Sequence, residues 1–210
     1  MGETNPTPTE RQLSPEKAAA ILAGGMQEFL THGYAATSMD RVATSAGVSK
    51  ATVYSHFQDK EGLFNALIRR LVEGKFRAMF GSGGDEMLQA DPAIVLHALA
   101  NRVLDTGMND PQFLNFMRVI LGESGRFPKL ARAFVRNIEQ TAFNTLRQYF
   151  TSCYQLNLSD PEATARIFIG TLVHFLIVQE MLQGKDIMPM ERDRLVENLV
   201  NLIVASAKNP

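Results

Sequence analysis

Cysteine, tryptophan and net charge are all scarce in this sequence, and none of its apolar runs is long. The single cysteine, Cys153, cannot form a disulfide within the chain, so we expect a protein of a reducing compartment. No apolar run approaches the roughly 20 residues needed to cross a bilayer, which argues against a membrane protein. The formal net charge of −1 over 210 residues gives no bulk sign of a nucleic-acid partner. These scarcities predict a cytoplasmic globular protein.

The sequence also lacks the signatures of most enzymes. It has no glycine-rich phosphate loop and no nucleophile elbow, and its four histidines do not have the spacing of metal ligands. We therefore expect no catalytic residue, no metal and no cofactor. Residues 1–14 lack the basic start and the apolar stretch of a signal peptide, and we interpret them as a disordered arm.

Helical periodicity is present almost throughout the chain. Ser14 followed by Pro15 is typical of a helix start, and apolar residues then recur at steps of three and four. Asp59 is placed to cap a long helix, which the glycine-rich segment 81–84 ends. Five further helices are expected near residues 92–106, 111–122, 127–153, 160–184 and 190–207. No strand pattern competes, so the predicted fold class is all-α, with about nine helices.

The first helix contains unusual glycines. Gly24 and Gly25 lie in its interior, where each glycine costs about 1 kcal/mol relative to alanine. We expect close packing against a neighbouring helix to compensate for that cost. Gly33 is expected to end this helix.

The segment 37–64 carries the most informative pattern. Ser38 can cap a short helix, and Gly47 lies where that helix must stop, because glycine tolerates the left-handed conformation. Ser49 can then cap a second short helix. The two helices would cross closely, and a small residue, Ala43, lies four positions before the glycine. This spacing predicts a helix-turn-helix.

The outward residues of the second short helix suit phosphates and base edges, because many of them donate hydrogen bonds. They are Lys50, Thr52, Tyr54, Ser55 and His56. An isolated turn of this kind more often presents an ordinary solvated surface. Here the small residue, the glycine, the inward valines and the capped helix that follows all have compatible spacings, which favours DNA recognition.

At these residues the chain resembles the TetR family of bacterial transcriptional regulators. The residues that carry the resemblance are Val42, Ala43, Gly47, Val48, Ser49, Thr52, Val53, Tyr54, His56, Phe57, Lys60 and Leu63. The similarity extends over roughly residues 15–65. Further along, the string GESGRFPKLARAF at 122–134 is similar to the ligand domain of the AefR-like subgroup. Ser55 departs from the family pattern, which often has a larger residue there, and this puts the width of the DNA footprint in doubt.

Each candidate DNA contact has an expected role. Lys50 and Thr52 would approach bases or flanking phosphates, Ala51 a thymine methyl group, and Tyr54 the backbone. The first 80 residues carry nine basic and eight acidic side chains, so attraction to phosphate must come from local placement. Lys60 would clamp a phosphate at the start of its helix. The full predicted set is Ser38, Arg41, Ser49, Lys50, Ala51, Thr52, Tyr54, Ser55, His56 and Lys60.

The last two predicted helices are apolar around much of their circumference. A small bundle covers one stripe of a helix, so we expect a second subunit to cover the remainder. The predicted two-fold dimer interface comprises Leu172, Phe175, Leu176, Leu195, Leu199, Leu202 and Ile203. A monomer whose core uses both helices is the alternative.

A small-molecule pocket is expected in the larger domain, because aromatic and methionine side chains form adaptable apolar cavities. The candidates are Phe113, Phe116, Met117, Ile120, Phe143, Phe168, His174 and Gln179. Ordinary core packing explains the apolar members equally well. A lone histidine such as His174 is also more often a satisfied core residue than a ligand contact.

The residues and the resemblance together imply a transcriptional regulator rather than an enzyme. We expect a three-helix DNA-binding domain at 15–60 and a helical ligand-binding and dimerisation domain at 61–210. The expected function is that of a ligand-responsive homodimeric repressor that binds a palindromic double-stranded operator. Two alternatives stay open: a helical dimer that binds small molecules without sequence-specific DNA binding, and an activator on the same fold.

Overall fold

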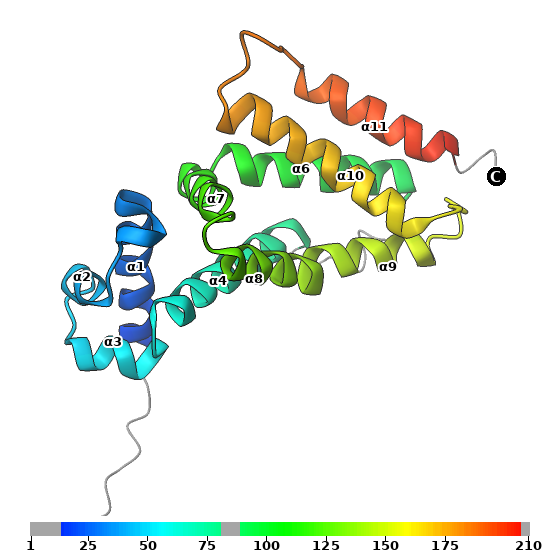
Figure 1. The fold of residues 1–210 in the computed structure, drawn as a ribbon. Coiled ribbons are helices and arrows are strands. Elements are labelled where there is room, and N and C mark those ends of the chain that lie inside the picture. Colours follow the sequence, from blue (N-terminus) through cyan, green and yellow to red (C-terminus); the bar gives the residue numbers. More distant parts are fainter. Residues whose placement is uncertain (1–13, 81–88, 207–210) are drawn as a thin grey trace, which may run out of the picture. The chain divides into compact units, whose positions relative to one another are not determined.

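The computed structural model describes residues 14–80 and 89–206. Within these ranges the chain forms ten α-helices and two π-helical segments and no strand (Figure 1), which confirms the all-α class. The expected arm, apart from Ser14, and the glycine-rich break at 81–84 lie outside the described residues. The predicted helix at 127–153 consists of two α-helices joined by a π-helical segment, which explains ten helices instead of about nine.

The chain divides into two compact units, with the boundary between Leu67 and Ile68. The first unit contains α1 (Pro15–Ala36), α2 (Met39–Ser45), α3 (Lys50–Phe57) and the start of α4 (Lys60–Phe80). The boundary lies later than residue 60 because the first turns of α4 supply core side chains to this unit. Phe64, for example, is fully buried and makes an edge-on contact with Phe29 at 5.0 Å between ring centroids.

The glycines of α1 allow close approach of its neighbours. A Cβ built on Gly24 would lie 2.9 Å from the backbone nitrogen of Ala46, and one on Gly25 would lie 3.0 Å from a methyl of Leu63. The expectation of close packing is therefore confirmed. Gly33 adopts φ 72°, a left-handed value, so it interrupts α1 as expected, although helical structure resumes up to Ala36.

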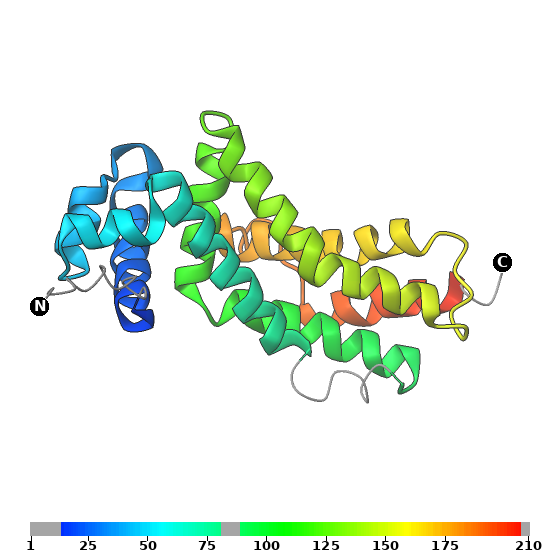
Figure 2. The same cartoon turned by 90° about the horizontal axis from the view of Figure 1, so that it is seen from below.

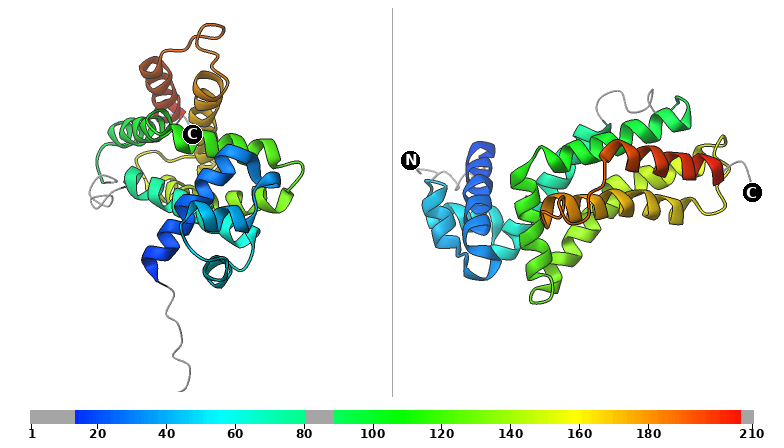
Figure 3. Two further views of the ribbon diagram at one scale, coloured as in Figure 1. Left: turned by 90° about the vertical axis from the view of Figure 1, so that its left-hand side faces the viewer. Right: turned by 90° about the horizontal axis from the view of Figure 1, so that it is seen from above.

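The second unit is a helical bundle (Figures 1 and 2). Its elements are the part of α4 from Ile68 onward, α6 (Pro92–Met108), α7 (Pro111–Glu123), α8 (Pro128–Ile138), η1 (Glu139–Phe143), α9 (Asn144–Ser152), α10 (Pro161–Phe175), η2 (Leu176–Met181) and α11 (Arg192–Ser206). Aspartates at 91, 110 and 160 cap α6, α7 and α10, each followed by proline at the first helical position. α11 packs on α6 and α10 packs on α9, as the views in Figures 2 and 3 show.

The helix formed by α10 and η2 is the exception to the expectation about apolar runs. Residues 161–181 are long and apolar enough to span a membrane. Phe168 and Leu172 of this helix lie in the hydrophobic core of the second unit with Phe150, so the helix serves here as a core element. One face of α10 stays uncovered, because Ile167 is 60% exposed and Val173 41% exposed.

Arg118 of α7 holds the C-terminal end of η2. Its guanidinium donates to the carbonyl oxygen of Glu180 at 3.1 Å and to that of Met181 at 3.0 Å. These carbonyls have no partner further along the helix, so the cation closes the helix end. Gln179 is buried, and its side-chain amide donates to the carbonyl of Met188 at 2.7 Å, which ties the following loop to η2.

Candidate nucleic-acid interface

The turn between α2 and α3 has the predicted geometry. The Ser38 hydroxyl accepts from the N–H of Arg41 at 3.3 Å, and the Ser49 hydroxyl accepts from that of Thr52 at 3.2 Å. Gly47 has φ 65°, the left-handed value that the sequence predicted. The segment is therefore a helix-turn-helix.

The inward side of the motif is packed as expected, with one difference. Val42 and Val53 are fully buried and Ala43 nearly so. The tightest backbone approach, however, is between Gly24 of α1 and Ala46 at the end of α2. The small residues that allow the helices to cross are thus shared between α1 and α2.

The outward side of α3 presents a mixed polar surface. Ala51, Tyr54 and Ser55 are exposed, with Tyr54 at 48%, whereas Thr52 and His56 are half-buried. The Ser55 hydroxyl donates to the carbonyl of Thr52 at 2.8 Å, so its hydrogen is used within the helix. Tyr54 is the largest exposed side chain on this face.

The basic and hydroxyl groups at the start of α3 have local partners. Lys50 forms an ion pair with Asp40 of α2, and both side chains are more than half exposed. Ser49 and Thr52 hydroxyls lie 2.8 Å apart. Ser38 and Ser49 thus orient the N-termini of α2 and α3, where backbone N–H groups favour an anion such as a phosphate. Arg41 is exposed in the first turn of α2.

Lys60 has a structural role that the sequence analysis did not anticipate. Its ammonium donates to the carbonyl oxygens of Tyr34 at 2.8 Å, Ala35 at 3.2 Å and Thr37 at 2.9 Å. It also lies 4.5 Å from the centre of the Tyr34 ring. Lys60 therefore closes the end of α1. Its charge, which was expected to bind a phosphate, is directed into the protein.

Thr37 and Tyr34 lie at this end of α1 and make polar contacts. Thr37 is buried, and its hydroxyl lies within hydrogen-bond distance of the carbonyls of Gly33 at 2.7 Å and Glu28 at 3.1 Å. Burial, helped by the carboxylates of Glu61 and Asp59, raises the pKa of Tyr34. The loop between α1 and α2 is therefore held by polar contacts that the helix-turn-helix spacing does not reveal.

Two sequence profiles cover most of the described chain. Residues 21–67 match the bacterial regulatory proteins of the tetR family, and residues 94–206 match the C-terminal domain of AefR-like transcriptional repressors. The chain belongs to the TetR family. Its helix-turn-helix is accordingly the DNA-binding domain of a transcriptional regulator, and neither the fold nor the relatives are those of an enzyme.

Individual TetR-family proteins are similar over different lengths. The transcriptional regulator YhgD of Bacillus subtilis is 34% identical over 93 residues, which are 44% of this chain and 44% of that protein. A TetR-family regulator of known structure from Mesorhizobium loti is 26% identical, with TM-score 0.74, over 91% of this chain and 98% of its own. The flavonoid-responsive regulator FrrA is 29% identical, with TM-score 0.72, over 92% and 97% of the two chains.

The candidate effector residues line neither of the two cavities found beside α9 among the described residues. Phe116, Ile120 and Phe168 are buried in the packing of the second unit, and Gln179 is committed to Met188. His174 is exposed, so it is neither a buried ligand contact nor a core residue. The remaining three, Phe113, Met117 and Phe143, are half-buried; the first lies under Lys75 and the last under Arg166.

The residues expected at the dimer interface are mostly covered within the chain itself. Leu172, Phe175, Leu176, Leu199 and Ile203 belong to the hydrophobic core, and Leu195 packs against that core. A side chain that its own chain already buries can add little contact area to a partner, which applies to the five core residues, whereas Leu195 is half-buried. Leu202, 71% exposed, is the exception.

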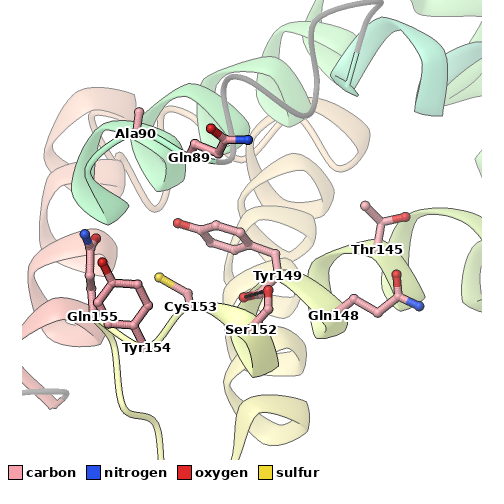
Figure 4. A pocket seen from close by; sticks show the side chains of 9 residues that line it. All are labelled: Gln89, Ala90, Thr145, Gln148, Tyr149, Ser152, Cys153, Tyr154 and Gln155. Atoms are coloured by element: carbon pink, nitrogen blue, oxygen red, sulfur yellow. Dashed lines mark hydrogen bonds between the residues drawn. The ribbon is translucent and has the colours of Figure 1, made fainter.

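A cavity of about 620 Å³ opens beside the C-terminal end of α9 (Figure 4). It is lined by Tyr149 and Cys153 together with hydroxyl and amide side chains, and none of the predicted effector residues lines it. No group of histidine, cysteine or carboxylate side chains in the described residues has a metal-binding arrangement. No sequence pattern indicates this cavity, because it arises where α9 meets the segment at the start of α6.

Proposed function

We propose that this TetR-family regulator is a homodimeric, effector-responsive repressor of the bacterial cytoplasm that binds a palindromic operator. The observation that carries the proposal is the exposed outward face of α3, around Tyr54, on a helix-turn-helix whose helix ends are closed by internal contacts. The face contains donors and a methyl group but few fixed charges, which suits base edges better than indiscriminate binding to phosphate.

A dimer follows from the uncovered faces of α10 and α11. Ile167 and Val173 on α10 and Leu202 on α11 are large, apolar and exposed. Gly170 lies on the same helix, and a Cβ there would meet nothing within 4 Å, so another helix could approach closely. Two copies of this surface can pair about a two-fold axis, and the two α3 helices would then read the two halves of a palindrome.

The dimer surface can be tested by charge. Ile167→Glu and Leu202→Glu should each shift the protein from dimer to monomer, measured as mass by light scattering, because a carboxylate would be buried at the interface. Ile94→Glu is the matched control: Ile94 is 63% exposed on α6, outside the proposed surface. A wild-type protein of monomer mass would contradict the proposal.

Response to an effector is supported by the cavity in the second unit and by relatives such as FrrA, which is described as flavonoid-responsive. α4 continues through the boundary between the units, and it can therefore transmit a shift from one unit to the other. A coupling of about 1–3 kcal/mol would change operator affinity roughly 5- to 150-fold. Repression is favoured over activation by the match to the AefR-like repressors. Activation is the alternative, because FasR, which is 38% identical over 58 residues, is a transcriptional activator.

The experiment for the operator uses purified protein and sheared genomic DNA at physiological salt. Retained fragments are sequenced and searched for a palindrome, and a reporter then shows whether the protein lowers or raises transcription from the neighbouring promoter. Enrichment of one palindrome with lowered transcription is expected. Raised transcription would instead indicate an activator, and a folded dimer that enriches no sequence would indicate a protein without specific DNA binding.

A further inference from the structure

The cavity at the end of α9 contains a buried hydroxyl whose polar neighbour is the thiol of Cys153, a weak hydrogen-bond partner. Tyr149 is only 5% exposed, and its hydroxyl forms no other hydrogen bond with the described residues. Figure 4 shows this hydroxyl pointing into the cavity, toward the side on which Cys153 lies. A buried polar group without a strong partner is costly, so its persistence calls for a ligand or a functional reason.

The rest of the lining is polar but uncharged. Gln89, Gln148 and Gln155 supply amides, Tyr154 a second aromatic ring, and Cys153 a thiol. Burial raises the pKa of Tyr149, as do Cys153 and Asp91, so the hydroxyl keeps its proton and can donate to an acceptor. The carboxylate of Asp91 disfavours an anion beside Tyr149, and the cation Arg147 lines the adjoining cavity that shares Gln148 and Ser152. The lining therefore matches a neutral molecule that carries a hydrogen-bond acceptor.

We propose that this cavity is the effector site, and that it takes an uncharged aromatic compound with a carbonyl or ether oxygen that accepts from Tyr149. The assignment rests on the proposed effector response. The cavity volume of about 620 Å³ accommodates a molecule of two or three rings. Tyr149 and Tyr154 offer aromatic contact to such rings, and the amides offer partners for further polar groups.

Cys153 supplies a direct readout of occupancy, because it is the single cysteine of the chain and lines the cavity. The probes are the methyl ester of flavone-6-carboxylic acid, which is neutral, and the free acid, which is an anion at neutral pH. Alkylation of Cys153 by iodoacetamide is followed by intact mass at increasing probe concentration. The ester should slow alkylation by about fivefold or more at saturation, and the acid should protect much less.

Two variants test the role of the buried hydroxyl. Tyr149→Phe should weaken protection by the ester by about three- to tenfold, because one hydrogen bond is lost. Its melting temperature should change little, since the hydroxyl's contact with the Cys153 thiol is a weak one. Tyr154→Phe is the matched control: it removes the same atom from a side chain that is 86% exposed, and its effect should stay below about twofold. Equal protection by ester and acid, no protection by either, or a Tyr149→Phe variant that behaves like wild type would overturn the assignment.

Operator affinity measured with the same probe separates this assignment from the proposed response. Protection of Cys153 together with a change in operator affinity supports both. Protection without that change supports the site and overturns the effector response. A change in operator affinity without protection of Cys153 overturns the site and leaves the response standing.

Discussion

In each of the two units a cation closes the end of a helix, but the two cations differ in how far along the chain they lie from the carbonyls they bind. In the first unit, Lys60 binds carbonyls of the α1 end, 23 to 26 residues earlier in the chain. In the second, Arg118 binds carbonyls at the end of η2, 62 and 63 residues later. Sequence analysis assigned Lys60 to DNA. A charged side chain beside a binding motif can therefore stabilise the fold that supports the motif.

The largest expected effect comes from the helix crossing in the first unit. Gly24→Ala should destabilise the protein by about 3 kcal/mol, because the new Cβ meets the backbone nitrogen of Ala46, which cannot rotate away. Gly107→Ala in the second unit should cost less, since its Cβ meets the flexible end of Leu176. Denaturant unfolding measures both. Gly74→Ala, where the space is open, is the control and should stabilise by about 0.5–1 kcal/mol.

If Gly107→Ala destabilises the protein as much as Gly24→Ala, the packing around Gly107 in the second unit is as tightly constrained as the helix crossing at Gly24 in the first.

Removing the cation of the first unit should have the next largest effect. Lys60→Met should lower the free energy of unfolding by about 2 kcal/mol, because three carbonyls lose a charged donor. Lys50→Met is the matched control and should cost less than about 1 kcal/mol, since its ion pair with Asp40 is exposed. Unchanged stability of Lys60→Met, with the salt dependence of operator binding reduced by about one unit of slope, would return Lys60 to a phosphate contact.

The corresponding change in the second unit is Arg118→Met. It should cost about 1–2 kcal/mol and should raise hydrogen exchange most strongly at the end of η2, where two carbonyls lose their donor. Uniform exchange changes across the unit would instead indicate that Arg118 stabilises the bundle generally.

A smaller, pH-dependent effect is expected at Asp110 of the second unit. Burial raises the pKa of its carboxyl, but the hydrogen bonds from Lys75 and the backbone outweigh it, so the pKa is lowered from 3.8. A lowered folded pKa contributes stability above the unfolded pKa, and this is lost as pH falls through the folded pKa. Asp110→Asn keeps a helix cap, and it should cost about 0.5–1 kcal/mol at neutral pH.

The difference between wild type and Asp110→Asn should shrink as the pH falls below 3.8 and the unfolded chain takes up a proton, and it should level off below the lowered folded pKa, where the aspartate is protonated in both states. A difference that is constant between pH 7 and pH 3 would show that neither Lys75 nor the backbone hydrogen bonds stabilise the charged carboxylate.

Local signals account for what could be predicted. The caps at Ser38 and Ser49, the left-handed Gly47 and the helical stripes are short-range features, and the structure contains each of them. Features that depend on distant segments were missed: the Lys60 contacts, the burial of the expected dimer residues and the cavity at Tyr149. An apolar stripe does not reveal whether the same chain or a partner covers it, which is why Leu199 and Leu202 looked alike and differ in exposure.

The central claim is that the outward face of α3 reads DNA while Lys60 holds the fold. Titration of one operator with wild type and Tyr54→Ala tests it most directly, alongside unfolding of both proteins. The account predicts that Tyr54→Ala binds about 10-fold or more weakly with an unchanged unfolding midpoint, because its side chain points away from the core. Unchanged operator affinity, or a loss that is explained entirely by unfolding, would contradict it.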